Sequence, residues 1–85
     1  MLKAIETHYI PPTNTRGSRY KATDGDGNSV SVGCLNSLNS EGNHREAAIA
    51  LCRKMDWHGT MTGGFCKAGM AWVFQDEDPA YNFTV

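Results

Sequence analysis

The chain has 85 residues, of which 40% are apolar and 20% are charged, and its formal net charge is −1. This length gives one small domain with a thin core, and the composition is ordinary for a soluble globular protein and too apolar for a disordered one. The longest apolar run, Gly69–Phe74, is far shorter than the roughly 20 residues that a membrane-spanning helix needs. We therefore expect a single soluble domain over residues 1–85, with residues 79–85 as a tail.

Three strands are expected in the first half of the chain. Residues 2–10 alternate loosely between polar and apolar side chains until Pro11 and Pro12 end the strand, because proline gives a sheet no hydrogen-bond donor. Residues 19–23 and 29–33 flank the sequence DGDGN, whose glycines and Asx residues readily take the positive φ values of a hairpin turn. These two segments are therefore predicted to form a hairpin.

A single helix is expected after a polar connector over residues 36–42. Asn43 is the predicted N-cap, and Glu46, three residues further on, completes a variant of the capping box. Gly59 is the predicted stop, since glycine readily takes the left-handed backbone that ends many helices. Between them, apolar side chains recur at helical spacing and predict the face that packs on the core: Ala48, Leu51, Cys52 and Met55.

Two further strands are expected over residues 60–62 and 70–74, with Gly63-Gly64 and Lys67-Ala68-Gly69 as turns or bulges between them. The element order is then β-β-β-α-β-β. This order predicts an α+β fold, in which one helix packs on a face of a small antiparallel sheet. Two alternatives are a β-β-β-α-β order and a separate pair of two-stranded sheets.

Two patterns resemble metal sites in part, and neither is complete. Asp24, Asp26 and Asn28 match the first three ligands of a calcium loop. Ser29 and Leu35, however, stand where that loop needs a glycine and a bidentate glutamate. Zinc prefers cysteine and histidine ligands in close pairs, and the chain has none. We therefore expect no metal and no other cofactor.

The three cysteines, Cys34, Cys52 and Cys66, are an odd and widely spaced set, which is a poor disulfide framework. No apolar signal segment begins the sequence, so we expect a cytoplasmic protein whose cysteines are reduced and behave as small buried hydrophobes. Cys66 is the one candidate nucleophile, because it lies in a glycine-rich segment with His58 nearby in the sequence. No third orienting group is evident, and no catalytic residue is expected.

A basic segment interleaved with aromatic residues follows the first expected strand and its Pro-Pro loop. Arginine and lysine side chains contact phosphates, and aromatic rings stack on bases, so this segment is a candidate surface for a partner or a nucleic acid. The alternative is an ordinary solvated strand edge, since the chain as a whole is not basic. The candidate residues are Arg16, Arg19, Tyr20 and Lys21.

Charge is distributed unevenly along the chain. Residues 1–23 carry a net charge of +3, whereas residues 68–85 carry −3. The acidic residues are Asp76, Glu77 and Asp78. We predict that they bind a partner with a basic surface. Tyr81 and Phe83, which follow them, are expected to dock on the domain.

Two tryptophans complete the candidate binding residues. Trp57 directly follows the expected helix, and Trp72 lies in the last expected strand. One or both are expected to anchor the core. An exposed Trp57 beside Arg53 is instead a candidate interface aromatic, because tryptophan and arginine are enriched at binding hot spots.

Three segments carry a resemblance to a group of proteins: Tyr9–Arg19 (YIPPTNTRGSR), His44–Ala48 (HREAA) and Trp72–Phe74 (WVF). With them the chain resembles, over about residues 1–75, small uncharacterised proteins carried by bacteriophages, prophages and plasmids. The resemblance implies a mobile-element setting inside a bacterial cytoplasm, and it carries over no catalytic residue. At the level of size and α+β class, the chain is also similar to anti-CRISPR proteins.

The leading hypothesis is therefore a non-enzymatic protein that inhibits a host defence complex through protein contact, with a CRISPR effector as the named target. The second hypothesis is a nucleic-acid-binding accessory protein that uses the basic segment Arg16–Lys21. The third is a small thiol- or metal-dependent enzyme centred on Cys66 and His58. All three place the chain in solution, with no membrane partner.

Overall fold

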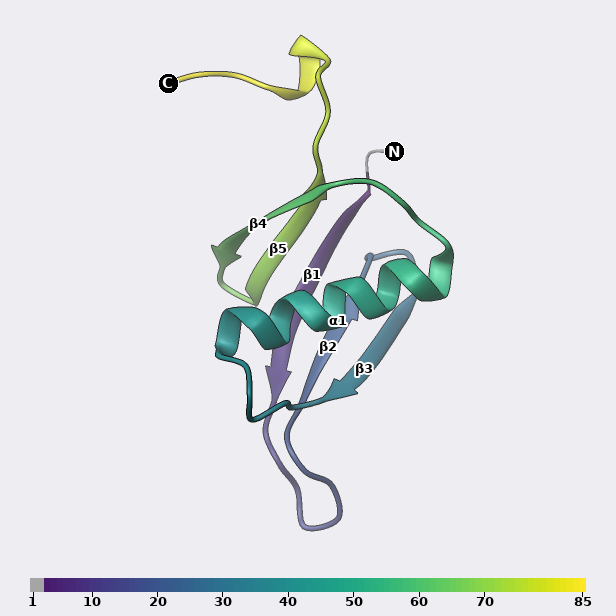
Figure 1. Cartoon of the computed structure of the whole chain (residues 1–85), viewed down its shortest axis with the longest axis vertical. Helices are drawn as coiled ribbons and strands as arrows, with labels where there is room; N and C mark the ends of the chain where they lie inside the picture. The colour runs from purple at the N-terminus through teal and green to yellow at the C-terminus, as the bar shows by residue number, and fades with distance from the viewer. Residues whose placement is uncertain (1–2) are drawn as a thin grey trace.

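The computed structural model describes residues 3–85, which form one antiparallel sheet with a single helix lying across one of its faces (Figure 1). The strands are β1 (Ala4–Ile10), β2 (Arg19–Thr23), β3 (Ser29–Gly33), β4 (Met61–Cys66) and β5 (Gly69–Phe74). The helix α1 (Ser40–Met55) precedes β4, and a 3-10 turn η1 (Pro79–Tyr81) follows β5. The strand order in the sheet is β3-β2-β1-β5-β4. The predicted α+β class and β-β-β-α-β-β order are thus confirmed, and neither alternative is formed.

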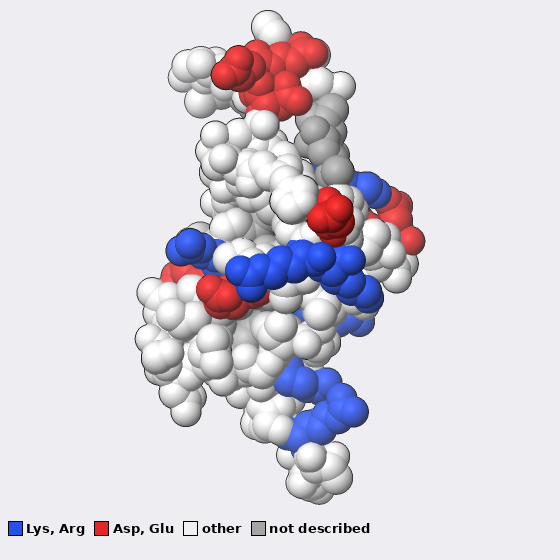
Figure 2. Space-filling view, turned by 45° about the vertical axis from the view of Figure 1, so that its right-hand side comes forward, with Lys and Arg blue, Asp and Glu red and all other residues white. Residues whose placement is uncertain are grey.

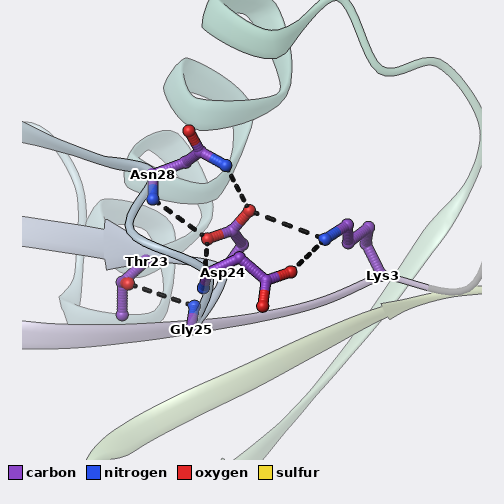
Figure 3. Close-up of polar contacts among 6 residues, drawn as sticks. Lys3, Thr23, Asp24, Gly25 and Asn28 are labelled. Carbon is purple, nitrogen blue, oxygen red and sulfur yellow. Dashed lines mark hydrogen bonds and ion pairs between the residues drawn. The ribbon is translucent and has the colours of Figure 1, made fainter.

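The turn between β2 and β3 is organised by the carboxylate of Asp24 (Figure 3). Its Oδ1 accepts hydrogen bonds from the backbone amides of Asp26, at 2.8 Å, and Asn28, at 3.2 Å. Its Oδ2 accepts one from Asn28 Nδ2 at 2.8 Å, and the pKa of Asp24 is lowered chiefly by this bond. The Lys3 ammonium pairs with both Asp24 and Asp26. The residues that partly matched a calcium loop therefore build the hairpin turn, as the strands on either side predicted.

The helix begins and ends elsewhere than predicted. Its N-cap is Asn39, whose Oδ1 accepts a hydrogen bond from the amide of Gly42 at 2.7 Å, so the first turn includes residues that were assigned to the connector. Asn43 is buried inside the helix, where its side chain accepts from the amide of Leu35 at 2.8 Å and donates to the Leu35 carbonyl at 3.1 Å. The predicted cap at Asn43 is therefore wrong, because a tertiary contact uses its amide group.

The helix ends at Asp56, which takes the left-handed conformation with φ 57°. The predicted stop at Gly59 is wrong for this reason. The apolar face was predicted correctly, since α1 buries Ala48 and Leu51 and half-buries Cys52 and Met55. This face packs on apolar side chains of β1 and β2. The buried core cluster consists of Ile5, Tyr20, Ala22, Ala47, Ala48 and Leu51.

Strand β4 is longer than predicted, because it contains Gly63 and Gly64, which were expected to form a turn or a bulge. Gly63 pairs with Trp72 of β5, and a Cβ atom at Gly63 would lie 2.5 Å from the indole ring. Glycine is therefore needed here to make room for Trp72 rather than to turn the chain. Only Lys67 and Ala68 remain as the turn between the two strands.

The last ten residues extend from one end of the molecule, whose overall dimensions are 48 × 28 × 22 Å (Figure 1). The side chains of Tyr81 and Phe83 are 59% and 89% exposed, so the expectation that they dock on the domain is wrong. Local hydrogen bonds give this segment its shape, since Asp78 caps η1 through the amide of Ala80 and the Asn82 side chain donates to the Asp78 carbonyl. Within residues 3–85 no helix is both long and apolar enough to cross a membrane.

Candidate nucleic-acid interface

The face of the sheet opposite α1 is uncovered, and the strand register decides which side chains it carries. Lys21 lies between His8 of β1 and Ser31 of β3. Directly opposite residues of antiparallel strands share a face, and alternate residues along a strand point to opposite faces. Because Tyr20 and Ala22 face the helix, Arg19 and Lys21 lie on the uncovered face.

Arg19 and Arg16 line a shallow hollow of about 520 Å³ at the end of this face, beside the loop between β1 and β2. The hollow is completed by Gly17, Ser18, Gly33, Cys34 and Asn36. Arg16 is exposed in the loop, where the Thr13 amide donates to its carbonyl at 2.8 Å and its own amide donates to Thr13 Oγ1 at 3.1 Å. Arg16 is exposed and Arg19 is half-buried, and the small residues beside them keep the hollow shallow.

These cations have no carboxylate partner within the described part of the chain. No carboxylate oxygen of residues 3–85 lies within 4.0 Å of a cationic nitrogen of Arg16, Arg19 or Lys21. The Nε atom of Arg19 is buried and makes no hydrogen bond among these residues. Glu6 is the one carboxylate that the strands place on this face, further along β1 opposite Thr23. The basic end of the face therefore offers donors to an anionic ligand.

Tyr20 does not belong to this surface. It is only 6% exposed on the helix side, where its ring contacts Tyr9 and His44 edge-on at centroid distances of 5.3 and 4.8 Å. The prediction that Tyr20 stacks on bases beside the arginines is therefore wrong. The described strands place no phenylalanine, tyrosine or tryptophan on the uncovered face, so phosphate contact rather than base stacking is the chemistry available there.

The acidic residues lie at the opposite end of the molecule. Figure 2 shows acidic side chains at the end that carries the tail, basic side chains at the other end, and a further basic band between them. Asp76 Oδ1 accepts from the amide of Asp78 at 2.7 Å, so part of this charge shapes the tail. The acidic cluster of the tail and the basic cluster of the β1–β2 loop thus lie at opposite ends of the longest dimension of the domain, while the middle carries charges of both signs (Figure 2).

Trp57 is half-buried and packs against the core together with Trp72. The Lys3 ammonium lies 5.8 Å from the centroid of the Trp57 ring. Both tryptophans line a groove of about 380 Å³ between α1 and the β4–β5 hairpin, called here the tryptophan groove. Its apolar lining includes Trp57, Met61, Trp72 and Phe74, and its basic lining Arg45 and Arg53. Trp57 is therefore both a core residue and part of an accessible concave surface.

The residues proposed for a thiol or zinc site are not brought together. Cys66 ends β4, a strand about 17 Å long, whereas His58 lies before its start. His58 instead pairs with Asp56, Nε2 to Oδ1 at 2.8 Å.

Cys66 is exposed, contrary to the expectation that every cysteine is buried, while Cys34 and Cys52 are half-buried. Burial raises the pKa of the Cys52 thiol. Within residues 3–85 no three cysteine, histidine or carboxylate side chains gather as metal ligands.

The sequence did not predict a buried polar network between the helix and the sheet. His44 Nδ1 lies 2.8 Å from Thr7 Oγ1, which also accepts a hydrogen bond from Trp72 Nε1 at 3.1 Å. Burial lowers the pKa of His44, which favours the neutral ring. The available signal was helical spacing, since His44 precedes Ala48 by four residues on the buried face. This network fixes the helix on the sheet and lies on the covered side.

Comparison of the chain with protein-family models, with curated proteins and with solved structures gives no match.

Proposed function

We propose that the chain is a binding protein rather than an enzyme, and that its uncovered sheet face binds the phosphate backbone of a nucleic-acid duplex. The observation that carries this proposal is the cluster of Arg16, Arg19 and Lys21 at one end of that face, without a carboxylate partner among residues 3–85. Charge-assisted hydrogen bonds from arginine and lysine to phosphate are among the strongest that a surface offers.

The shape of the face supports a duplex as the ligand. Small residues such as Ser31 and Gly33 beside the cations let the sheet backbone approach a phosphate closely. Sheets and β-ribbons are known to bind duplexes through their faces. A single strand would be expected to need aromatic side chains for stacking, and the strands supply none there. Contacts of this kind position a protein on a duplex without reading its sequence.

The experiment is a titration of a fluorescently labelled duplex with the protein at several salt concentrations. Three phosphate contacts give a slope of log K against log salt of about −2.7, which is a loss of affinity of about 40-fold between about 50 and 200 mM salt. Replacing both Arg16 and Arg19 with alanine should reduce the slope to about −0.9. Arg45→Ala/Arg53→Ala is the matched control, since it removes two cations from the helix side. An equal loss in this control would contradict the proposal.

A second candidate is inhibition of a host defence complex in a bacterial cytoplasm, with a CRISPR effector as the named target. The separation of Asp76, Glu77 and Asp78 from the basic end favours it, because an acidic projection of this kind can mimic nucleic-acid charge toward a basic protein surface. The tagged protein is expressed in a bacterium with an active CRISPR system and purified after nuclease treatment. A stoichiometric effector subunit in the eluate supports inhibition, whereas loss of all partners after nuclease supports duplex binding.

A further inference from the structure

The tryptophan groove is an apolar surface with basic side chains beside it. Helix α1 packs chiefly on β1, β2 and β3, and this leaves the helix-facing side of the β4–β5 hairpin partly open. Trp72 lies over Gly63, and the Phe74 ring lies against Gly59, so aromatic rings form much of the lining. Arg45 and Arg53 of α1 are exposed and border the groove. The groove therefore fits a segment that combines carboxylates with apolar side chains.

The tail, residues 75–85, has this combination. Its three carboxylates precede three apolar residues that are largely exposed: Tyr81 at 59%, Phe83 at 89% and Val85 at 110%. An aromatic side chain gains most when it leaves water for an apolar pocket, and the tail gives Phe83 no such pocket. Carboxylates ahead of the aromatic residues are complementary to the arginines beside the groove.

The tail of the same chain turns away from this groove. The Gln75 amide donates to the Thr60 carbonyl at 2.8 Å, and Gln75 Nε2 donates to Thr62 Oγ1 at 2.8 Å, which fixes where the tail leaves the sheet. Tyr81 then borders a hollow shared with Ala4 and Val73, which lie on the uncovered face. The groove lies on the opposite, helix-facing side of the sheet, and no residue of the same chain's tail lines it.

We propose that the tail of one copy binds the tryptophan groove of a second copy, and that two copies exchange tails reciprocally. Phe74 lines the groove, and the tail begins at the next residue, so the root of the tail and the groove lie at the same end of the domain. Two copies that meet through this end are related by a two-fold axis, and each tail of residues 75–85 reaches up to roughly 36 Å when extended. The exchange therefore closes as a dimer and does not extend into a fibre.

The first test is sedimentation equilibrium of the full chain across a wide range of concentration. We expect a monomer–dimer equilibrium whose dissociation constant rises by about tenfold or more in Tyr81→Ala/Phe83→Ala. Phe65→Ala is the matched control, because Phe65 is 77% exposed and belongs to neither the tail nor the groove. Intrinsic fluorescence gives a second readout, since both tryptophans of the chain line the groove and their emission should change with dimer formation.

A mixing experiment separates exchange between copies from docking within one copy. Arg45→Glu alters only the groove, and Glu77→Lys alters only the tail. Each variant alone should dimerise more weakly, because like charges then meet at both contacts. A mixture should recover a heterodimer, in which one contact is unaltered and the other joins a tail of reversed charge to a groove of reversed charge. A chain that stays monomeric at every concentration overturns the proposal. So does a dimer that survives Tyr81→Ala/Phe83→Ala, or a tail effect on fluorescence that is independent of concentration.

Discussion

The two ends of the domain carry opposite charge, and they differ in how that charge is used. At the tail end, Lys3 pairs with Asp24 and Asp26, and Asp24 also holds the hairpin turn through three hydrogen bonds. At the loop end, Arg16 and Arg19 have no carboxylate partner among residues 3–85. The paired charges around Asp24 therefore serve the fold, whereas the unpaired arginines are available to the duplex that we propose as the ligand.

The largest expected effect is on duplex affinity. Arg16→Glu/Arg19→Glu should lower it on the order of 100-fold, because two phosphate contacts are replaced by repulsion. The free energy of unfolding should change by less than about 0.5 kcal/mol for Arg16, which is exposed, and by about 1 kcal/mol for Arg19, which is half-buried. Fluorescence titration and thermal unfolding measure the two quantities on the same sample.

The corresponding experiment at the tail end replaces Lys3. Lys3→Glu brings a third carboxylate beside Asp24 and Asp26, so it should lower the melting temperature and leave duplex affinity nearly unchanged. A large loss of stability in the arginine variant, or a large loss of affinity in the lysine variant, would remove the distinction between the ends.

The next effect is on stability alone and comes from the buried middle of the domain. Thr7→Val keeps the shape of a fully buried side chain but removes the oxygen that accepts from Trp72 Nε1. A buried polar group that loses its partner costs about 1–3 kcal/mol, which lowers the melting temperature of a domain of this size by roughly 10 °C. Thr60→Val is the control, since Thr60 is exposed just before β4, and it should stay within about 0.5 kcal/mol of the parent. A comparable loss of stability in both variants would contradict a stabilising role for the buried network.

A smaller difference is expected between two asparagines at the start of α1. Asn39→Ala removes the N-cap and should cost about 1 kcal/mol. Asn43→Ala should cost more, within about 1–3 kcal/mol, because it also leaves the Leu35 amide without its acceptor. Leu35 lies between Cys34 and Asn36, which line the basic hollow, so only Asn43→Ala should also weaken duplex binding. Chemical unfolding with a duplex titration distinguishes the two, and equal costs would make Asn43 an ordinary helix residue.

The sequence could predict those parts of the fold that depend on neighbours along the chain. The hairpin strands 19–23 and 29–33 have the predicted bounds, because their turn residues and alternation are local signals. Asn43 was misassigned because an asparagine near the start of a helix can either cap it or bond to a preceding loop. The sequence does not distinguish the two, and the side chain of Asn43 bonds to the backbone of Leu35. Gly63 was misassigned because its purpose, space for Trp72, exists only across the β4–β5 pair, and Gly64 continues the same strand.

The membership of the candidate site could be predicted from the sequence even less, because it depends on which face of the sheet the helix covers. Alternation in β2 separates Tyr20 from Arg19 and Lys21, but it does not say which of the two faces the helix covers. The burial of Tyr20 decides this, and it removes base stacking from the candidate interface. The separation of the two charged ends likewise follows from the strand order, because β5 pairs antiparallel with β1 and so brings the tail to the end opposite the β1–β2 loop (Figure 1).

The smallest expected effect is a dependence of stability on pH that originates at His44. Burial is the main cause that lowers the pKa of this ring, and the nearby His8 acts in the same direction, while Thr7 and Glu41 act to raise it. In the unfolded chain the imidazole has its ordinary pKa of about 6.5. Between that value and the lower pKa of the folded state, the unfolded chain binds more protons than the folded one, so stability rises with pH.

The stabilising contribution is therefore fully present above about pH 6.5, and it is lost as the pH falls toward the lowered pKa of the folded protein. Chemical unfolding at a series of pH values between about 5 and 7 measures it. His44→Leu should flatten the profile, because Thr7 Oγ1 can still donate to the Met70 carbonyl while no buried ring remains to be protonated. If His44→Leu keeps the slope of the parent profile, the titrating group lies outside the buried network, and the middle of the domain has no part in the pH response.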